Sequence, residues 1–337
     1  MNALHQVHMV TTISTMKRGG LIVAGLLLAI SESSQAVIVA GANGAGSSNN
    51  TTRSQFESAT GTSFPNFDNV IPYSAGGTGI YLGYNPGTSD FWVLTAEHIF
   101  NDVSNVTIGG TTYTHPGAAN VFPIPGSDLS LNRFTTALPL PNLSPVTLAS
   151  SSPIAGEFVA MMGRGRQRAE AGSINPLLSD ATDFGGGDSG YTWTSDRVMR
   201  WGTNNVANSP DGVVFPFSGP GIPGTQVFST VFDEPGLGEW TTSNEAQGSG
   251  GDSGGGVFTL SGTGEWELSG IFSAADAYSA DGDIVSVFDD SLESRTYITD
   301  IATFRDEIDA ITGTLVPEPT SIVLVLIPSG LLLRRRR

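Results

Sequence analysis

The sequence of 337 residues contains no cysteine. This absence excludes a disulfide framework, a thiolate metal site and a cysteine nucleophile. Charged residues make up only 14% of the chain, and residues 37–316 contain no lysine. Within that range 9 arginines stand against 30 acidic side chains, a net charge of −21. Because such a surface repels phosphate backbones, nucleic acid is not an expected partner, and the acidity is interpreted as an aid to solubility.

Long helical patterns are also scarce, whereas glycine (43) and proline (19) are abundant. Short β-rich runs separated by turn residues occur at 79–84, 91–95, 103–108, 157–162 and 257–260. This pattern predicts an all-β fold, either a sandwich or a pair of barrels. Prolines and serines cluster at 138–153, which indicates a crossing between two halves.

One helix is expected near the end of the chain. Thr299 or Asp300 can cap its N-terminus. Apolar residues then recur at helical spacing on one face, namely Ile301, Phe304, Ile308 and Ile311.

The N-terminal segment is predicted to be an export signal. Lys17 and Arg18 precede the apolar run 21–30, and a short polar stretch follows that ends at Ala36. This is the order of regions in a secretory signal peptide, which predicts cleavage after Ala36 and a mature protein beginning at Val37. A permanent membrane anchor is the alternative, although an apolar run of this length is short for a bilayer.

The C-terminal segment combines an apolar run at 322–333 with four arginines at 334–337. A hydrophobic segment followed by cations is a stop-transfer pattern. Together with Pro317-Glu318-Pro319, residues 316–337 resemble the PEP-CTERM sorting tail of Gram-negative bacteria. The resemblance implies recognition and removal by an exosortase, so that the membrane is contacted only through this transmembrane-like tail before processing; a plain tail anchor is the alternative. Both interpretations place residues 37–316 outside the cytoplasm, at the cell surface or in the medium.

Histidine is scarce enough to limit the candidates for a general base. Residues 37–316 contain only His98 and His115, and imidazole is the usual base at neutral pH. His98 follows the apolar run 91–95, so a buried strand would hold it rigidly. His115 stands beside Pro116 in a turn-like stretch and is interpreted as a surface residue.

The segment Gly251-Asp-Ser-Gly-Gly-Gly256 is the candidate nucleophile loop. A serine nucleophile needs an exposed hydroxyl and neighbouring N–H groups that can bind a developing oxyanion. Flanking glycines allow a sharp turn and a close approach of the substrate. The segment 185–190 also contains Gly-Asp-Ser-Gly but lacks the next glycine, and it is interpreted as a flexible loop. The arginine-rich segment 164–168 is interpreted as a source of local ion pairs, not as a polyanion site.

Five segments with candidate roles in catalysis follow one another along the chain. They are Thr95-Ala-Glu-His98, Asp128-Leu-Ser-Leu-Asn-Arg-Phe134, Gly163-Arg-Gly165, Gly251-Asp-Ser-Gly-Gly255 and Leu268-Ser-Gly-Ile-Phe-Ser273. In content and order they resemble segments of the trypsin/chymotrypsin-like serine proteases, although Glu97 replaces an alanine of that family, Ile99 a cysteine and Arg164 a tryptophan. The resemblance covers about residues 75–312 and implies a double six-stranded β-barrel with a C-terminal helix, formed by residues 37–315.

The resemblance also assigns catalytic roles. Ser253 would attack the scissile carbonyl, His98 would accept and return the proton, and Asp128 would orient His98. The N–H groups of Gly251 and Ser253 would form the oxyanion hole. A cut after Ala36 would let the new amine of Val37 pair with Asp252, as in the activation of that family, unless residues 41–52 are a pro-segment or Asp252 binds an arginine.

Substrate binding is the remaining expectation from the resemblance. Ser273, Ala274 and Ala275 would pair with the substrate backbone as an added strand. Gln247, six residues before Ser253, would lie at the bottom of the primary specificity pocket and disfavour cleavage after lysine or arginine. Arg295 is the alternative residue for that pocket and would favour acidic side chains.

The sequence thus predicts an exported serine endopeptidase acting on proteins or peptides, without a metal or cofactor and with signal peptidase and exosortase as processing partners. One alternative is a catalytically inactive cell-surface or matrix protein with the same fold. Another is a β-sandwich hydrolase of a different type.

Overall fold

The computed structural model describes nine segments, all within the compact unit Ser33–Arg337. The predicted signal peptide, the tail after Val316 and residues 185–188 lie outside them. No helix of these segments is long and apolar enough to cross a membrane. The segments are 37–41, 50–73, 76–99, 105–168, 189–214, 224–233, 241–280, 283–288 and 294–316.

A seven-stranded antiparallel sheet forms the first half of the fold. Its central strands bury both faces, because successive side chains point to opposite sides. Ile80 and Leu82 enter one apolar core, whereas Tyr81 packs with Phe91 in another. In spatial order the strands are β6 (Thr111–Tyr113), β5 (Val106–Ile108), β2 (Val70–Tyr73), β3 (Gly77–Asn85), β4 (Asp90–Ala96), β8 (Leu129–Thr135) and β7 (Val121–Pro123).

The second half contains a closed six-stranded barrel. Its ring runs through β12 (Arg200–Asn208), β9 (Phe158–Gly163), β16 (Gly256–Leu260), β17 (Trp266–Ala275), β20 (Arg295–Asp300) and β14 (Thr225–Val231). Pairing of β14 with β12 closes the ring, and closure removes the free edges of these strands. Three more strands extend this sheet: β15 (Asn244–Gln247), β1 (Ile38–Gly41) and β13 (Val213–Val214).

A four-stranded sheet was not predicted, and it includes Ser189 and Gly190, so the interpretation of segment 185–190 as a loop is wrong for these two residues. It consists of β10 (Arg166–Arg168), β11 (Ser189–Arg197), β19 (Asp283–Phe288) and β18 (Tyr278–Ala280). The residues of β10 are Arg-Gln-Arg, which have no apolar alternation to indicate a strand. Their pairing with β11 is a tertiary effect that local sequence does not encode.

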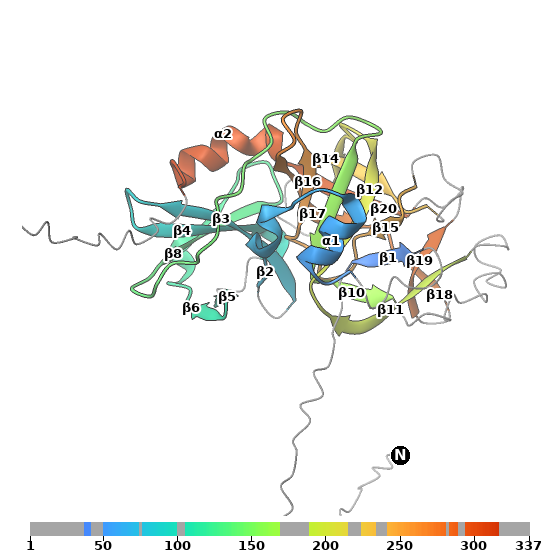
Figure 1. Cartoon of the computed structure of the whole chain (residues 1–337), viewed down its shortest axis with the longest axis horizontal. Helices are drawn as coiled ribbons and strands as arrows, with labels where there is room; N and C mark the ends of the chain where they lie inside the picture. The colour runs from blue at the N-terminus through green and yellow to red at the C-terminus, as the bar shows by residue number, and fades with distance from the viewer. Residues whose placement is uncertain are drawn as a thin grey trace, which may run out of the picture. The chain divides into compact units, whose positions relative to one another are not determined.

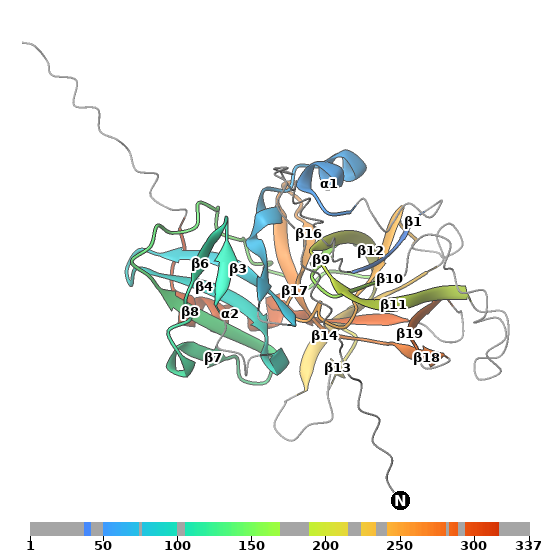
Figure 2. The ribbon, with the colours of Figure 1, turned by 90° about the horizontal axis from the view of Figure 1, so that it is seen from below.

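The C-terminal helix α2 (Ile301–Thr312) confirms the expectation from sequence. Asp300 caps it by accepting a hydrogen bond from the N–H of Ala302 at 3.1 Å. Figures 1 and 2 show α2 beside β4 and β8, so the end of the chain returns to the first sheet. Asn85 donates to the carbonyl of Thr312 at 2.6 Å, and Val316 forms an isolated bridge with Tyr84.

The remaining helices are short. Helix α1 (Arg53–Thr60) was not predicted, because Phe56 is its only buried residue. A capping box between Thr52 and Gln55 begins it. Three 3-10 helices complete the described elements: η2 (Pro65–Asn69), η3 (Glu97–Ile99) and η4 (Ala118–Asn120).

These pairings confirm the predicted all-β fold of the chymotrypsin type with a C-terminal helix, although only one six-stranded barrel is closed and the seven-stranded sheet forms a half-barrel. In both views the strands of the first sheet gather on one side and those of the closed barrel on the other (Figures 1 and 2). Residues 136–157 connect β8 to β9 and include the predicted crossing. Chemistry that needs groups from both sheets therefore has to occur where the two sheets meet.

Candidate active site

Ser253, His98 and Asp128 form a continuous hydrogen-bonded chain. His98 lies in η3 directly after β4, Asp128 directly precedes β8, and Ser253 lies in the loop between β15 and β16. The His98 Nε2 atom is 2.7 Å from Ser253 Oγ, and His98 Nδ1 is 2.8 Å from Asp128 Oδ2. Because β4 and β8 are paired, the first sheet presents the histidine and the aspartate at the same end. The structure thus brings together the three residues that the sequence predicts to be catalytic.

Asp128 fixes the orientation of His98 at two points. Its carboxylate is fully buried, and its second oxygen accepts the backbone N–H of His98 at 3.0 Å. A carboxylate facing Nδ1 favours the tautomer in which Nδ1 carries the proton and Nε2 has a free lone pair. That lone pair faces the hydroxyl of Ser253. Burial and the charge of Asp128 raise the pKa of the adjacent Glu97, whose side chain makes no hydrogen bond to the imidazole.

The loop around Ser253 is held between the two halves of the fold. The Ser253 carbonyl accepts the N–H of Thr78 at 2.9 Å, and the N–H of Gly254 donates to Phe272 at 3.0 Å. Gly254 has φ +83°, and a Cβ there would overlap the Thr78 carbonyl. Among the described residues, the N–H groups of Gly251 and Ser253 donate no hydrogen bond. These are the two donors predicted for an oxyanion hole.

Asp252 is buried beneath this loop at 1% exposure. Its carboxylate accepts the N–H groups of Gly165 at 2.6 Å and Ser249 at 2.7 Å, and the Ser249 hydroxyl at 2.9 Å. Burial raises the pKa of Asp252 to about 6, and these hydrogen bonds limit the rise. A Cβ at Gly163 or Gly165 would overlap this carboxylate, which explains the two glycines around Arg164.

The backbone of Val37 also contacts Asp252. Its N–H donates to the Asp252 carboxylate, and Val37 is 1% exposed. Ile38, Val39 and Ala40 are equally buried. Their strand β1 pairs with β15, the strand that directly precedes the nucleophile loop in sequence. The residue that follows the predicted cleavage point is thus buried and in contact with Asp252. That a free amine forms at Val37 stays a prediction.

A pocket of about 200 Å³ opens beside Ser253. Ser273, Ala274 and Ala275 line it, in the place expected of a substrate-binding strand. Its other walls are also mainly apolar or small. They are formed by Trp193, Gly248, Ser249, Gly250, Asp252, Phe272 and Ala277.

Neither residue that the sequence nominated for the pocket floor lines this cavity. Gln247 is fully buried, and its amide donates to the Asp276 carbonyl at 2.6 Å. Arg295 instead forms an ion pair with Asp211 at 3.3 Å. Trp193, which does line the pocket, was missed because it lies in the unexpected four-stranded sheet.

The interpretation of His115 as a surface residue is wrong. His115 is only 7% exposed and packs edge-on against Phe134. Its Nδ1 accepts the N–H of Gly117 at 3.0 Å, so the proton lies on Nε2, which donates to Asn132 at 3.2 Å. Burial lowers the pKa of His115. A neutral histidine with both nitrogens engaged has a structural role.

The arginines of segment 164–168 also differ from expectation. Arg164 and Arg166 make no ion pair among the described residues, and Arg168 lies over the ring of Tyr191 at 4.5 Å. The predicted local ion pairs with acidic residues are therefore not formed by Arg164 or Arg166 among the described residues.

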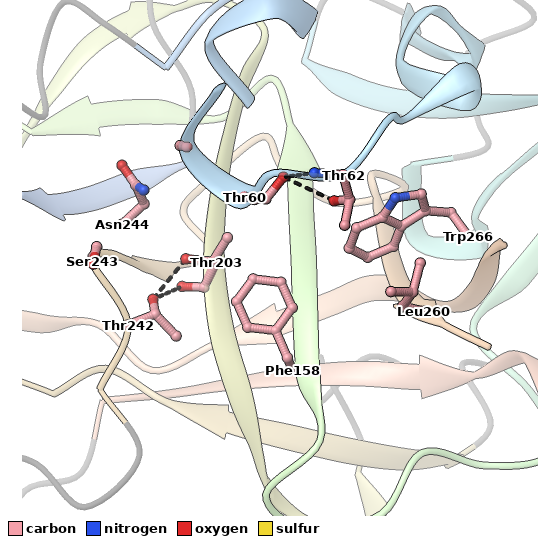
Figure 3. A pocket seen from close by; sticks show the side chains of 10 residues that line it. Thr60, Thr62, Phe158, Thr203, Thr242, Ser243, Asn244, Leu260 and Trp266 are labelled. Carbon is pink, nitrogen blue, oxygen red and sulfur yellow. Dashed lines mark hydrogen bonds between the residues drawn. The ribbon is translucent and has the colours of Figure 1, made fainter. Parts of the chain in front are cut away.

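A second hollow of about 320 Å³ lies beside the end of α1 (Figure 3). Phe158, Leu260 and Trp266 form its apolar part, and threonine hydroxyls around it bond to one another. It has no titratable lining residue and shares none with the pocket at Ser253. The described residues contain no cluster of histidine and acidic side chains suited to a metal ion.

No protein-family model and no curated protein matches the chain. Among solved structures it is similar to Rv3671c from M. tuberculosis H37Rv, a serine-to-alanine mutant in its inactive form. That match has 15% identity and a TM-score of 0.38, and covers 74% of this chain and 90% of the other. A mutant of human heparin binding protein (CAP37) is similar at 17% identity and a TM-score of 0.44, covering 77% and 97%. Likenesses at this level carry no argument about activity, so the site has to be judged by its own geometry.

Proposed function

We propose that the protein is a serine endopeptidase that cleaves peptide bonds through an acyl-enzyme. The observation that supports this most strongly is the hydrogen-bonded chain from Asp128 through His98 to Ser253. Such a chain lets a serine hydroxyl lose its proton as it attacks a carbonyl. The single base available at the loop, the buried carboxylate behind it and the free N–H groups in front of it all fit this chemistry.

The proposed reaction proceeds in two halves. In the first, Ser253 Oγ bonds to the carbonyl carbon, its proton passes to His98 Nε2, and the carbonyl oxygen becomes an oxyanion bound by Gly251 and Ser253 N–H groups. The C–N bond then breaks, and His98 returns the proton to the departing amine. In the second half, water attacks the ester, His98 accepts its proton, and Ser253 recovers that proton as the acid leaves. Throughout, Asp128 stabilises the protonated imidazole.

The pocket beside Ser253 supports a preference for an uncharged side chain before the scissile bond. Its volume of about 200 Å³ is below the usual range for whole small-molecule ligands, about 300–1,000 Å³, and fits one side chain. Asp252 is its only ionisable lining residue among those described, and four N–H or O–H donors engage that carboxylate. Small or medium apolar residues are therefore the proposed class.

A fluorophosphonate probe tests the activity directly. The purified protein should be labelled at one site, and peptide mapping by mass spectrometry should place the label on Ser253. Prior heat denaturation should abolish labelling, because the probe requires the assembled site. Absence of labelling in folded protein would contradict the proposal and favour a catalytically inactive surface or matrix protein with this fold.

We further propose that the protein is exported and acts outside the cytoplasm. The contact of the Val37 N–H with the buried carboxylate of Asp252 supports signal peptidase cleavage after Ala36, because a cut there would place the new amine beside that carboxylate. Exosortase processing of residues 316–337 is proposed from their likeness to a sorting tail. Intact-mass measurement of the protein recovered from the host tests both cuts, since an uncut chain would retain the mass of either segment.

A further inference from the structure

Basic side chains are concentrated in one part of the acidic fold. Five of the 9 arginines in residues 37–316 fall between positions 164 and 200, and no lysine exists there. Arg166 and Arg197 are partners in the pairing of β10 with β11. Burial lowers the pKa of Arg164, and the nearby positive charge of Arg197 lowers it further. Three like charges are thus gathered although acidic residues outnumber basic ones three to one.

This cluster borders the candidate nucleophile loop. The guanidinium carbon of Arg197 is 3.2 Å from where a Cβ on Gly251 would lie, and Nη1 is 2.9 Å from that position on Gly76. Arg166 Nε is 3.7 Å from the corresponding position on Gly250. The backbone N–H of Arg164 donates to the Thr78 hydroxyl at 2.9 Å, and that hydroxyl donates to the Gly251 carbonyl at 3.2 Å.

Arg197 lies on the side of Ser253 that faces β3, whereas Arg166 lies beside Gly250, which also lines the side-chain pocket. Ser253 is held between Thr78 at the start of β3 and Phe272 on β17. The side-chain pocket is formed along β17 by Phe272 and the residues after it, whereas Arg197 reaches Gly76, directly before β3. A peptide whose acyl side chain occupies the pocket would continue past Ser253 on the side of Gly76 and Arg197.

We propose that Arg164, Arg166 and Arg197 select substrates with aspartate or glutamate within the first two residues after the scissile bond. This inference rests on the proposed function and specifies its substrate class. Guanidinium groups form charge-assisted, frequently bidentate hydrogen bonds with carboxylates. Arg164 and Arg166 have no ion pair among the described residues that a substrate would need to displace. An acidic peptide also offsets the repulsion that Arg197 exerts on Arg164.

Peptide binding to the Ser253→Ala variant tests the selection without requiring turnover. Three fluorescent peptides are compared by anisotropy, identical except for Asp, Asn or Lys at the two positions after an alanine that fills the pocket. Binding is expected to be about five- to tenfold tighter for Asp than for Asn, the size of a partly exposed charge-assisted contact, and weakest for Lys. Equal binding of all three peptides would overturn the proposal.

Substitution of the arginines identifies the source of the preference. In the Ser253→Ala background, Arg166→Gln with Arg197→Gln should remove most of the preference for the Asp peptide over the Asn peptide, and Arg164 accounts for what remains. Arg305→Gln removes the same kind of charge from α2 and should leave the Asp-to-Asn ratio unchanged. If the double variant does not fold, Arg166→Gln alone should reduce the ratio partially. A ratio lowered equally by Arg305→Gln would contradict a local contact.

Turnover of the same peptides by the unmodified protein separates this inference from the proposed function. Labelling of Ser253 together with faster cleavage of the Asp peptide supports both. Labelling with equal kcat/KM for the Asp and Asn peptides overturns the selection alone. Tighter binding of the Asp peptide without labelling of Ser253 overturns the proposed protease activity but supports a binding site for acidic peptides.

Discussion

At the scale of single residues, the proposed chemistry depends on which aspartate, which histidine and which Gly-Asp-Ser-Gly serine lie within hydrogen-bonding distance of one another. Two aspartates flank the candidate site, two histidines are available, and Gly-Asp-Ser-Gly occurs twice. The order of motifs identified His98, Asp128 and Ser253, because each motif sits at the end of a recognisable strand. The burial of His115 was not predictable, because it depends on Asn132 and Phe134 across the sheet.

Replacing Asp128 by asparagine should lower turnover by about 10⁴-fold near neutral pH with little change in structure. The amide would present its NH₂ to Nδ1 or favour the tautomer that places the proton toward Ser253. Steady-state kinetics on a cleaved peptide measures the loss. The matched control is Glu97→Gln, an amide substitution at a neighbouring carboxylate that makes no hydrogen bond to the imidazole, and it should retain most activity. Near-normal turnover in Asp128→Asn would show that another group orients His98.

The two Gly-Asp-Ser-Gly serines should respond differently to removal of their hydroxyls. Ser253→Ala should reduce kcat by about 10⁴–10⁶-fold, because the nucleophile is lost while substrate binding remains. Ser189→Ala should be nearly silent. Comparable losses in the two variants, measured with matched unfolding temperatures, would refute the assignment of the nucleophile.

At the scale of elements, part of the strand pattern was predictable from short β-rich runs separated by turn residues. The expected run 91–95 became β4 (Asp90–Ala96), and 157–162 became β9 (Phe158–Gly163). The four-stranded sheet was not predictable, because Arg-Gln-Arg in β10 pairs only in the context of β11. Consequently Trp193 and Arg197, which border the site, could not be placed from sequence.

The Gly-x-Gly segment at the end of β9 should be sensitive to a single methyl group. Gly165→Ala places a Cβ against the carboxylate of Asp252 and the Ser249 hydroxyl. Overpacking of this kind costs about 1–3 kcal/mol, and displacement of Asp252 should also reduce activity. Denaturant unfolding measures the first effect and peptide cleavage the second. Gly262→Ala is the control, because nothing lies within 4 Å of the added carbon; equal stability of the two variants would contradict this packing.

At the scale of the whole fold, the closed barrel and the first sheet meet at Ser253, and Asp252 connects that point to the beginning of β1. Asp252 has a pKa of about 6 in this uncut chain, above its unfolded value of about 3.9. Its stabilising contribution is therefore complete below about pH 4 and is lost as the pH rises through about 6. A charged amine at Val37 would stabilise the ionised carboxylate of Asp252 and so restore this stabilising contribution at neutral pH, since the amine keeps its proton to about pH 8.

Protein beginning at Val37 should thus exceed protein beginning at Gln35 in unfolding temperature at pH 7. The gap should narrow toward pH 4, where Asp252 is protonated, and again at alkaline pH, where the amine is neutral. Activity of the Val37 form should decline over the same alkaline range. Scanning calorimetry and peptide cleavage from pH 4 to 9 check these expectations. Identical curves for the two forms would rule out the amine as the activating group.

The isolated bridge between Val316 and Tyr84 has a mechanical consequence. Any tension applied through the chain beyond Val316 enters the fold at this bridge and at the contact of Asn85 with the last turn of α2. The load is thus directed first into the far end of β3 and not into the loop that carries Ser253.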